Sequence, residues 1–128
     1  MKQVIIDTNV IARYLLADIP EQFEEAVKVF TKIEKGEERG YISILVIDEL
    51  IWVMENYYSF DRRDFIQNII KILYNKEIYI IESKKETIIK ILEKMKSNKI
   101  DFTDLYLYEI KGSRTVISFD RDFKKLKN

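Results

Sequence analysis

The chain has 128 residues, and its 22 basic side chains balance 22 acidic ones, so its formal net charge is zero. With 47% hydrophobic residues, it is long and apolar enough to form one packed domain rather than a disordered chain. It contains neither cysteine nor histidine, which excludes disulfide scaffolds, zinc fingers, imidazole-ligated metals and histidine-dependent catalysis. Its three glycines, Gly36, Gly40 and Gly112, are too scattered to form a phosphate-binding or dinucleotide-binding loop.

Charge and hydropathy vary along the chain. Residues 1–64 carry 8 basic and 13 acidic side chains, whereas residues 65–128 carry 14 and 9. The basic excess is concentrated in residues 84–99, which form either a solvated helix face or a surface for a polyanion. Asp7 interrupts the early apolar run, and no run approaches the roughly 18 residues of a membrane span or resembles a signal peptide. We therefore expect a cytoplasmic protein.

Apolar periodicity and helix-capping residues predict strands that alternate with helices. In chain order we expect a strand at 3–6, helices at 10–17 and from Pro20 to Gly36, a strand at 41–43, helices at 44–57 and 61–74, a strand at 77–81, helices within 84–99 and at 101–110, and a strand at 115–118. Strands separated by one or two helices imply parallel crossovers. The expected fold is one α/β domain over residues 1–128, a three-layer α/β/α sandwich with a mostly parallel sheet of four to five strands.

Acidic residues follow two of these strands. Parallel sheets place functional residues beyond the carboxyl ends of their strands, and Asp7 and Asp120 occupy that position. Each has a structural alternative, because Asp7 fits a helix cap and Asp120 fits a turn. Asp101 and Asp104 have the spacing of a helix start, so both could be caps, or Asp104 could point to the same edge of the sheet.

Glu49 is the acid that is hardest to explain as a surface residue. At 100° per residue it falls inside the predicted apolar arc of its helix, while Asp48 and Glu55 fall on the solvent side. A carboxylate on a core-facing stripe requires a cation or an ion pair. Three arginines are available for an ion pair: Arg13, Arg114 and Arg121.

Together, four to six carboxylates from separate elements converge on one predicted edge of the sheet. In a site without histidine or cysteine, such a cluster selects a hard cation, Mg²⁺ or Mn²⁺. These ions neutralise phosphate charge and turn water into a nucleophile. The sequence therefore favours metal-dependent hydrolysis of phosphodiesters.

Four segments, in this order, resemble the PIN domain family. They are Val4-Ile5-Ile6-Asp7-Thr8-Asn9-Val10, the stretch from Ile42-Ser43 through Val46 to Glu49-Leu50, Asp101-Phe102-Thr103-Asp104, and Ser118-Phe119-Asp120-Arg121-Asp122-Phe123. The resemblance covers about residues 3–126, and the single-domain size is similar to that of VapC-type toxins. It implies a Mg²⁺- or Mn²⁺-dependent endoribonuclease that is often dimeric and commonly paired with a small antitoxin, whose tail occupies the active-site groove.

The resemblance also implies roles for individual residues. It assigns metal binding and catalysis to Asp7, Glu49, Asp104 and Asp120, with Asp122 as an accessory acid and Asp101 as a rival to Asp104. It assigns hydrogen-bonding support of that cluster to Thr8, Asn9 and Ser118. This sequence departs from the family pattern in a slightly shorter interval between Asp104 and Asp120, in the bulky residues Tyr106, Tyr108 and Glu109, and in the expected loss of a short fifth strand.

RNA that approaches an acidic cluster needs basic residues nearby. We expect Arg121, Lys124, Lys125 and Arg114 to bind RNA, because Arg121 adjoins Asp120; the lysines of residues 84–99 are the alternative. A different functional hypothesis is a PIN-like binding module with a structural ion and little or no nuclease activity. A third is an enzyme that acts on DNA flaps or small phosphoesters.

Overall fold

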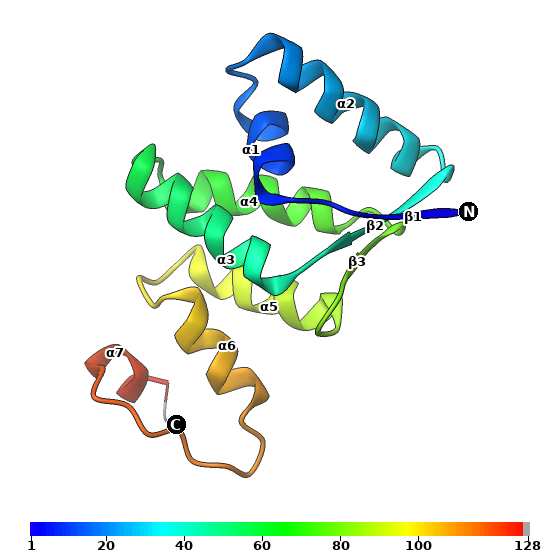
Figure 1. The fold of residues 1–128 in the computed structure, drawn as a ribbon. Helices are drawn as coiled ribbons and strands as arrows, with labels where there is room; N and C mark the ends of the chain where they lie inside the picture. The colour runs from blue at the N-terminus through cyan, green and yellow to red at the C-terminus, as the bar shows by residue number, and fades with distance from the viewer. Residues whose placement is uncertain (127–128) are drawn as a thin grey trace.

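A computed structural model describes residues 1–126 as a small parallel sheet with helices packed around it (Figure 1). The strands are β1 (Lys2–Ile5), β2 (Glu38–Ile42) and β3 (Ile78–Ile80). The helices are α1 (Thr8–Leu16), α2 (Pro20–Glu34), α3 (Ile44–Trp52), α4 (Arg62–Leu73), α5 (Lys85–Met95), α6 (Phe102–Ile110) and α7 (Arg121–Lys124), and a π-helical turn, η1 (Val53–Tyr57), continues α3. The predicted α/β class is confirmed. No helix within residues 1–126 is both long and apolar enough to cross a membrane.

The three strands lie in the order β1–β2–β3, and both pairs are parallel. Val4 pairs with Gly40, which in turn pairs with Ile78. Because parallel strands end at the same edge of a sheet, the residues that follow β1, β2 and β3 share that edge. Asp7 lies there, as the sequence predicts.

Gly40 allows α2 to pack closely against one face of the sheet. A Cβ atom at this position would lie 2.9 Å from Cδ1 of Ile33 on α2 and 3.1 Å from Cδ1 of Ile6. A larger residue would therefore force the Ile33 and Ile6 side chains to shift. The opposite face carries Ile5 and Tyr79, which are exposed.

Local sequence sets the helix starts. Pro20 occupies the first turn of α2, where its missing N–H group is not needed. The Asp61 carboxylate accepts a hydrogen bond from the backbone N–H of Arg63 at 2.9 Å and so caps α4. The Ser43 hydroxyl caps α3 by accepting from the N–H of Leu45 at 3.1 Å.

The strand predicted at residues 115–118 does not form, so the described residues contain three strands rather than four or five. Residues 111–120, here called the C-terminal arm, follow α6 without joining the sheet (Figure 1). The β-branched residues Thr115, Val116 and Ile117 favour an extended backbone, but a strand forms only where a neighbouring strand edge supplies hydrogen bonds. After the arm, α7 packs Phe123 against Tyr108 of α6, with ring centroids 6.4 Å apart.

Candidate active site

Asp7 lies directly after β1 and caps α1. Its Oδ1 atom accepts a hydrogen bond from the backbone N–H of Thr8 at 2.8 Å. A carboxylate has two oxygens, so this cap leaves the other oxygen of the exposed Asp7 for a ligand. Thr8 itself is buried, and its hydroxyl has no hydrogen-bond partner in the part of the chain that the structure describes.

Glu82 is a polar residue at the same edge of the sheet that the sequence analysis missed. Its carboxylate accepts hydrogen bonds from the Ser43 hydroxyl and from the backbone N–H of Ile44, the latter at 2.8 Å. Burial opposes ionisation of Glu82, but these hydrogen bonds outweigh it and hold the pKa of Glu82 below its ordinary value. The signal was available in the sequence, because Glu82 directly follows the strand predicted at 77–81, just as Asp7 follows the first strand.

Several acids share one cavity of about 280 Å³ beside α3 and α6. We call it the acidic cavity. Its acidic lining residues are Asp48, Glu55, Asp101, Asp104 and Asp120. Asp48 and Glu55 come from α3 and η1, Asp101 and Asp104 from the start of α6, and Asp120 from the end of the C-terminal arm. The fold thus brings three of the predicted acids, Asp101, Asp104 and Asp120, into one place.

Crowding of like charges in this cavity shifts carboxyl pKa values. Burial raises the pKa of Asp104, and the negative charges of Asp120 and Asp101 raise it further. The pKa of Asp48 is raised by burial and then by Asp101. Arg62 offsets part of this charge at the rim, with a guanidinium nitrogen 2.8 Å from Glu55 and 4.0 Å from Asp101. A bound cation would stabilise the ionised acids in the same way.

A local turn holds Asp120 in position. The backbone N–H of Asp120 donates to the Ser118 hydroxyl at 3.0 Å. The Asp120 carboxylate in turn accepts from the N–H of Asp122 at 2.9 Å and caps α7. Ser118 therefore contacts the acid that the resemblance assigns it to support.

Glu49 is exposed, contrary to the expectation that it lies on the core-facing stripe of its helix. The buried stripe of this segment consists of Ile47, Leu50, Ile51 and Met54, so it is rotated away from the arc predicted from the sequence. Asp48 is exposed, as expected, and it lines the acidic cavity.

The ion pair considered for Glu49 does not form within residues 1–126. Arg13 pairs with Asp18 at 2.7 Å. The Arg114 guanidinium donates to the carbonyl oxygens of Lys111 and Ile110 at 2.9 and 2.8 Å. None of the salt bridges among the described residues involves Glu49 or Arg121.

The four acids assigned to metal binding do not form one coordination group in this structure. Asp104 and Asp120 line the acidic cavity, whereas Asp7 and Glu49 do not. Among residues 1–126, no three acidic side chains lie close enough together to hold a metal ion. The donor chemistry does suit Mg²⁺ or Mn²⁺, because every candidate ligand is a carboxylate. A cation would also offset the neighbouring negative charges that oppose the ionisation of Asp104.

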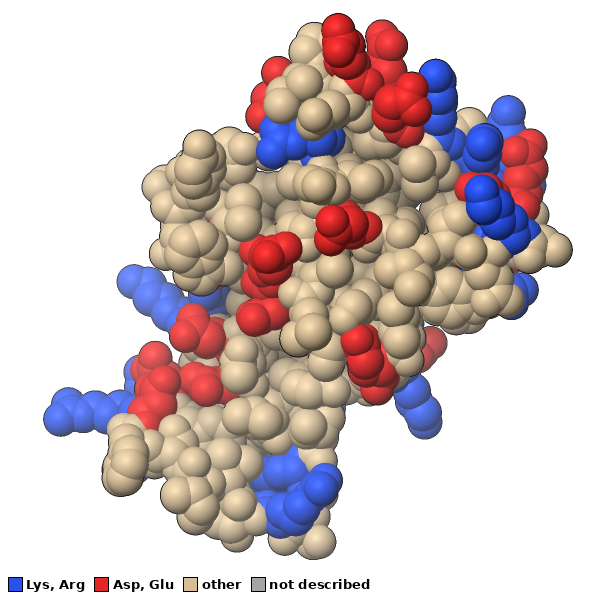
Figure 2. Space-filling view, in the orientation of Figure 1, with Lys and Arg blue, Asp and Glu red and all other residues tan. Residues whose placement is uncertain are grey.

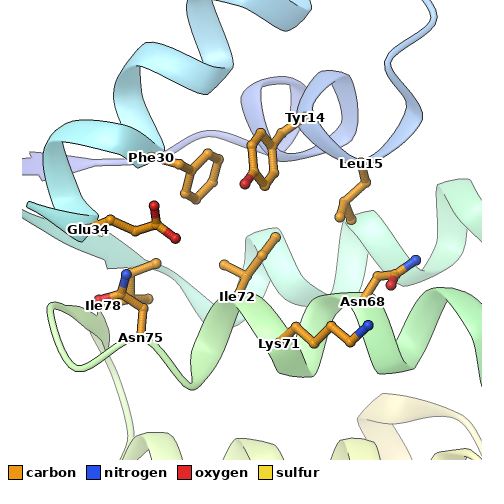
Figure 3. A pocket seen from close by; sticks show the side chains of 9 residues that line it. All are labelled: Tyr14, Leu15, Phe30, Glu34, Asn68, Lys71, Ile72, Asn75 and Ile78. Atoms are coloured by element: carbon orange, nitrogen blue, oxygen red, sulfur yellow. The ribbon is translucent and has the colours of Figure 1, made fainter.

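A second cavity, of about 300 Å³, lies between α1, α2 and α4 (Figure 3). The rings of Tyr14 and Phe30 pack in it with centroids 4.3 Å apart, and Glu34 and Lys71 are its charged lining residues. With a single carboxylate, this cavity lacks the donors for a hard metal ion. Asn9 lines a different cavity, between α1 and α2.

The basic residues expected to bind RNA gather near α7. Arg121, Lys124 and Lys125 are exposed, and Lys125 forms an ion pair of 3.4 Å with Asp122. Figure 2 shows acidic side chains in a band that runs across this face from α1 over α3 to α6 and α7, with basic side chains projecting beside its α7 end. A polyanion that approaches this face therefore meets favourable charge near α7.

A parallel sheet with an acid after its first strand, together with the acidic cavity, defines an α/β domain with a carboxylate-based site. A model of the PIN domain family matches residues 4–128, nearly the whole chain. The chain belongs to the PIN domain family.

Comparison with individual proteins gives one curated relative. VapC ribonuclease of Aquifex aeolicus (strain VF5) is 27% identical over 124 residues, which cover 95% of this chain and 90% of the relative. No solved structure matches the chain.

Proposed function

We propose that this chain is an endoribonuclease that hydrolyses phosphodiester bonds in RNA, and that it is the toxin of a toxin–antitoxin pair. Membership of the PIN domain family and similarity to VapC ribonuclease along nearly the whole chain support this function. The observation in the molecule that carries it is the acidic cavity, where Asp120 and Asp101 crowd Asp104. Clustered carboxylates of this kind are typical of sites that hold hard cations for phosphodiester chemistry.

The proposed cofactor is Mg²⁺ or Mn²⁺. Asp7, Glu49, Asp104 and Asp120 would hold it, with Asp122 as an accessory acid and Asp101 as the rival to Asp104. When bound, the ion would neutralise phosphate charge and lower the pKa of a water molecule. One oxygen of the Asp7 carboxylate caps α1, and the other remains available for this role. Thr8, Asn9 and Ser118 are proposed to support the acids by hydrogen bonding when the ion is bound. In this structure Ser118 accepts from the backbone N–H of Asp120, and the Thr8 hydroxyl has no partner among the described residues.

RNA binding is assigned to Arg121, Lys124, Lys125 and Arg114. Of these, Arg121 has the best position, since it is exposed and directly follows Asp120. Lys94 of the alternative basic segment is already paired with Glu109 at 2.8 Å, which favours α7 as the site of phosphate contact.

The proposed partners are RNA, a small antitoxin protein and a second copy of the chain, acting in the cytoplasm. A basic antitoxin tail would match the charge of the acidic cavity. We further propose that the complete sheet has four to five strands in a three-layer sandwich. The exposed residues on one face of the three-stranded sheet support this.

A second candidate function is a PIN-like binding module in which the acids hold one structural ion without efficient catalysis. The separation of Asp7 and Glu49 from the acidic cavity favours it.

A substrate panel distinguishes these functions. The purified chain is incubated with a mixed RNA pool, a DNA pool of the same sequences and a small phosphodiester, each with Mg²⁺, with Mn²⁺ or with EDTA. We expect internal cleavage of RNA that requires the metal and is absent for DNA. Metal-dependent thermal stabilisation without cleavage of any substrate would favour the binding module and overturn the proposed enzyme.

A further inference from the structure

The chain contains one tryptophan, Trp52, which lies at the end of α3 and is 62% exposed. The core does not use it, because the buried stripe of this segment consists of Ile47, Leu50, Ile51 and Met54. An indole in solvent leaves a large apolar surface unburied, and such rings are common where a protein contacts a ligand or a partner. The indole of Trp52 is therefore accessible to a ligand.

Trp52 lines the acidic cavity, together with Asn56 from the next helical turn. The volume of this cavity, about 280 Å³, lies at the lower end of the range for ligand sites, so it suits one small group. The cavity thus combines one aromatic wall with several polar side chains.

Hydrogen-bond acceptors dominate the polar lining of this cavity. The side-chain nitrogen of Asn56 donates to the backbone carbonyl oxygen of Trp52 at 3.0 Å. This bond fixes the orientation of the amide and leaves Oδ1 of Asn56 as an acceptor. The acids of the lining, among them Asp48, also accept when they are ionised. A ligand that fits beside Trp52 should therefore present N–H groups.

The RNA path assigned to α7 leads to the same cavity. Arg121, the proposed phosphate contact, directly follows Asp120, and Asp120 lines the cavity with Trp52. A strand whose phosphate is held at Arg121 can turn a neighbouring base toward the cavity. The uncharged base then meets the acids, whereas the phosphates stay with the basic residues.

We propose that the indole of Trp52 stacks on one base of the bound RNA, and that the acceptors beside it favour a base with an exocyclic amino group. Stacking on aromatic side chains is a common mode of recognition of single-stranded RNA. Adenine, cytosine and guanine each carry an amino group that can donate to Oδ1 of Asn56 or to Asp48. Uracil carries two carbonyl oxygens instead, which ionised acids repel. This base subsite rests on the proposed ribonuclease function and adds a preference for these three bases over uracil.

Tryptophan fluorescence tests the stacking directly, because Trp52 is the one tryptophan of the chain. The purified chain is titrated with heptaribonucleotides UUUXUUU, where X is A, C, G or U, in EDTA and, by stopped flow before cleavage, in Mg²⁺. Anisotropy of the same oligonucleotides with a dye label measures binding independently. We expect bound RNA to quench the emission with the dissociation constant that anisotropy gives. This constant should be roughly threefold or more lower for A, C or G than for U.

Variants separate stacking from base preference. Trp52→Ala should weaken binding of every oligonucleotide about tenfold, and Trp52→Phe should restore part of the loss. Asn56→Ala should keep the quenching and reduce the preference over uracil. Tyr74→Ala is the matched control, since this ring is 65% exposed and does not line the acidic cavity, and it should bind RNA as the wild type does. Circular dichroism checks that each variant folds.

Several results would overturn the subsite. RNA that binds by anisotropy without changing the emission, or that binds Trp52→Ala as tightly as the wild type, would show that no base stacks on this ring. Equal or tighter binding of the uracil oligonucleotide would contradict the base preference. Quenching by a hexa-arginine peptide but not by RNA would assign the ring to a cationic ligand, and an emission that shifts with protein concentration alone would assign it to a second copy. RNA that binds in neither EDTA nor Mg²⁺ would instead contradict the proposed ribonuclease function.

Discussion

Asp104 lies in the acidic cavity, and its surroundings oppose its ionisation. Burial and the charges of Asp120 and Asp101 raise its pKa, so its ionised form is less favourable in the folded chain than in the unfolded chain. An acid whose pKa is raised by folding destabilises the fold wherever it is ionised. That cost fades as the pH falls through the carboxyl range.

We therefore expect Asp104→Asn, in EDTA, to raise the melting temperature near pH 7 by roughly 1–4 °C. The gain should shrink as the pH is lowered and vanish near about pH 3, where the wild-type acid is protonated. Thermal melts followed by circular dichroism over this pH range measure it. Glu24→Gln, at an exposed acid without an ion pair among the described residues, is the control. A lower melting temperature for Asp104→Asn at pH 7 would show that its carboxylate stabilises the chain.

Two helices are joined by one acid with two basic partners. Glu109 of α6 lies 2.8 Å from Lys94 and 3.2 Å from Lys90, both on α5. The hydrogen bond from Lys94 holds the pKa of Glu109 below its ordinary value despite burial, and Lys90 adds to the effect. A lowered pKa stabilises the fold above the pKa of the unfolded chain, and this stabilisation is lost as the pH falls through the carboxyl range.

Glu109→Gln should therefore lower the free energy of unfolding by about 0.5–1 kcal/mol at pH 7 and by less near pH 3. Urea unfolding at the two pH values measures this difference. Glu25→Gln removes the fully solvated pair with Lys28, 3.1 Å apart, and should change the free energy little. Equal effects of the two variants at pH 7 would contradict a special role for the α5–α6 contact.

The RNA contact is assigned to α7. Replacing Arg121, Lys124 and Lys125 together with Gln should weaken RNA binding about tenfold or more and flatten its salt dependence, because fewer counterions are released. The control variant replaces Lys84 and Lys99, two exposed residues of the alternative basic segment, with Gln. Fluorescence anisotropy at several salt concentrations measures both variants. If the Lys84 and Lys99 variant sets the salt slope instead, the proposed path of the RNA is wrong.

Elements with strong local signals were predicted well from the sequence. Residues 3–6 read as a strand that stops at Asp7, and Asp61 reads as a helix cap; both were found. The second strand begins at Glu38, before the predicted Tyr41, because pairing with β1 recruits the polar residues Glu38 and Arg39. Such recruitment depends on a neighbour distant in the sequence.

Non-local contacts also explain what the sequence missed. The orientation of α3 depends on what packs against it, so the helical wheel wrongly placed Glu49 in the core. Asp48 is exposed as predicted, but its place in the acidic cavity depends on α6 and the C-terminal arm. The position of Glu82 directly after the strand predicted at 77–81 was an available signal, but its contact with Ser43, 39 positions away, was not. The strand predicted at residues 115–118 was wrong, because strand propensity does not supply a pairing partner and no strand within the described residues pairs with this segment.

At the scale of the whole molecule, zero net charge conceals opposite charges in the two halves of the chain. Acidic side chains form a band across one face, and basic side chains project beside its α7 end (Figure 2). This arrangement suits a polyanion that is held by α7 and cut where a cation has neutralised the acids.

We propose that Asp7 and the other acids assigned to metal binding hydrolyse RNA through a bound metal ion. The most direct measurement is the initial rate of RNA cleavage as Mg²⁺ is titrated, for the wild type and for Asp7→Asn, which removes charge with little change in shape. We expect wild-type cleavage to rise with Mg²⁺ and to stop in EDTA. Asp7→Asn, with native circular dichroism, should cleave at least about a hundredfold more slowly at every concentration. Wild-type cleavage that persists in EDTA, or full activity of Asp7→Asn in Mg²⁺, would contradict the account.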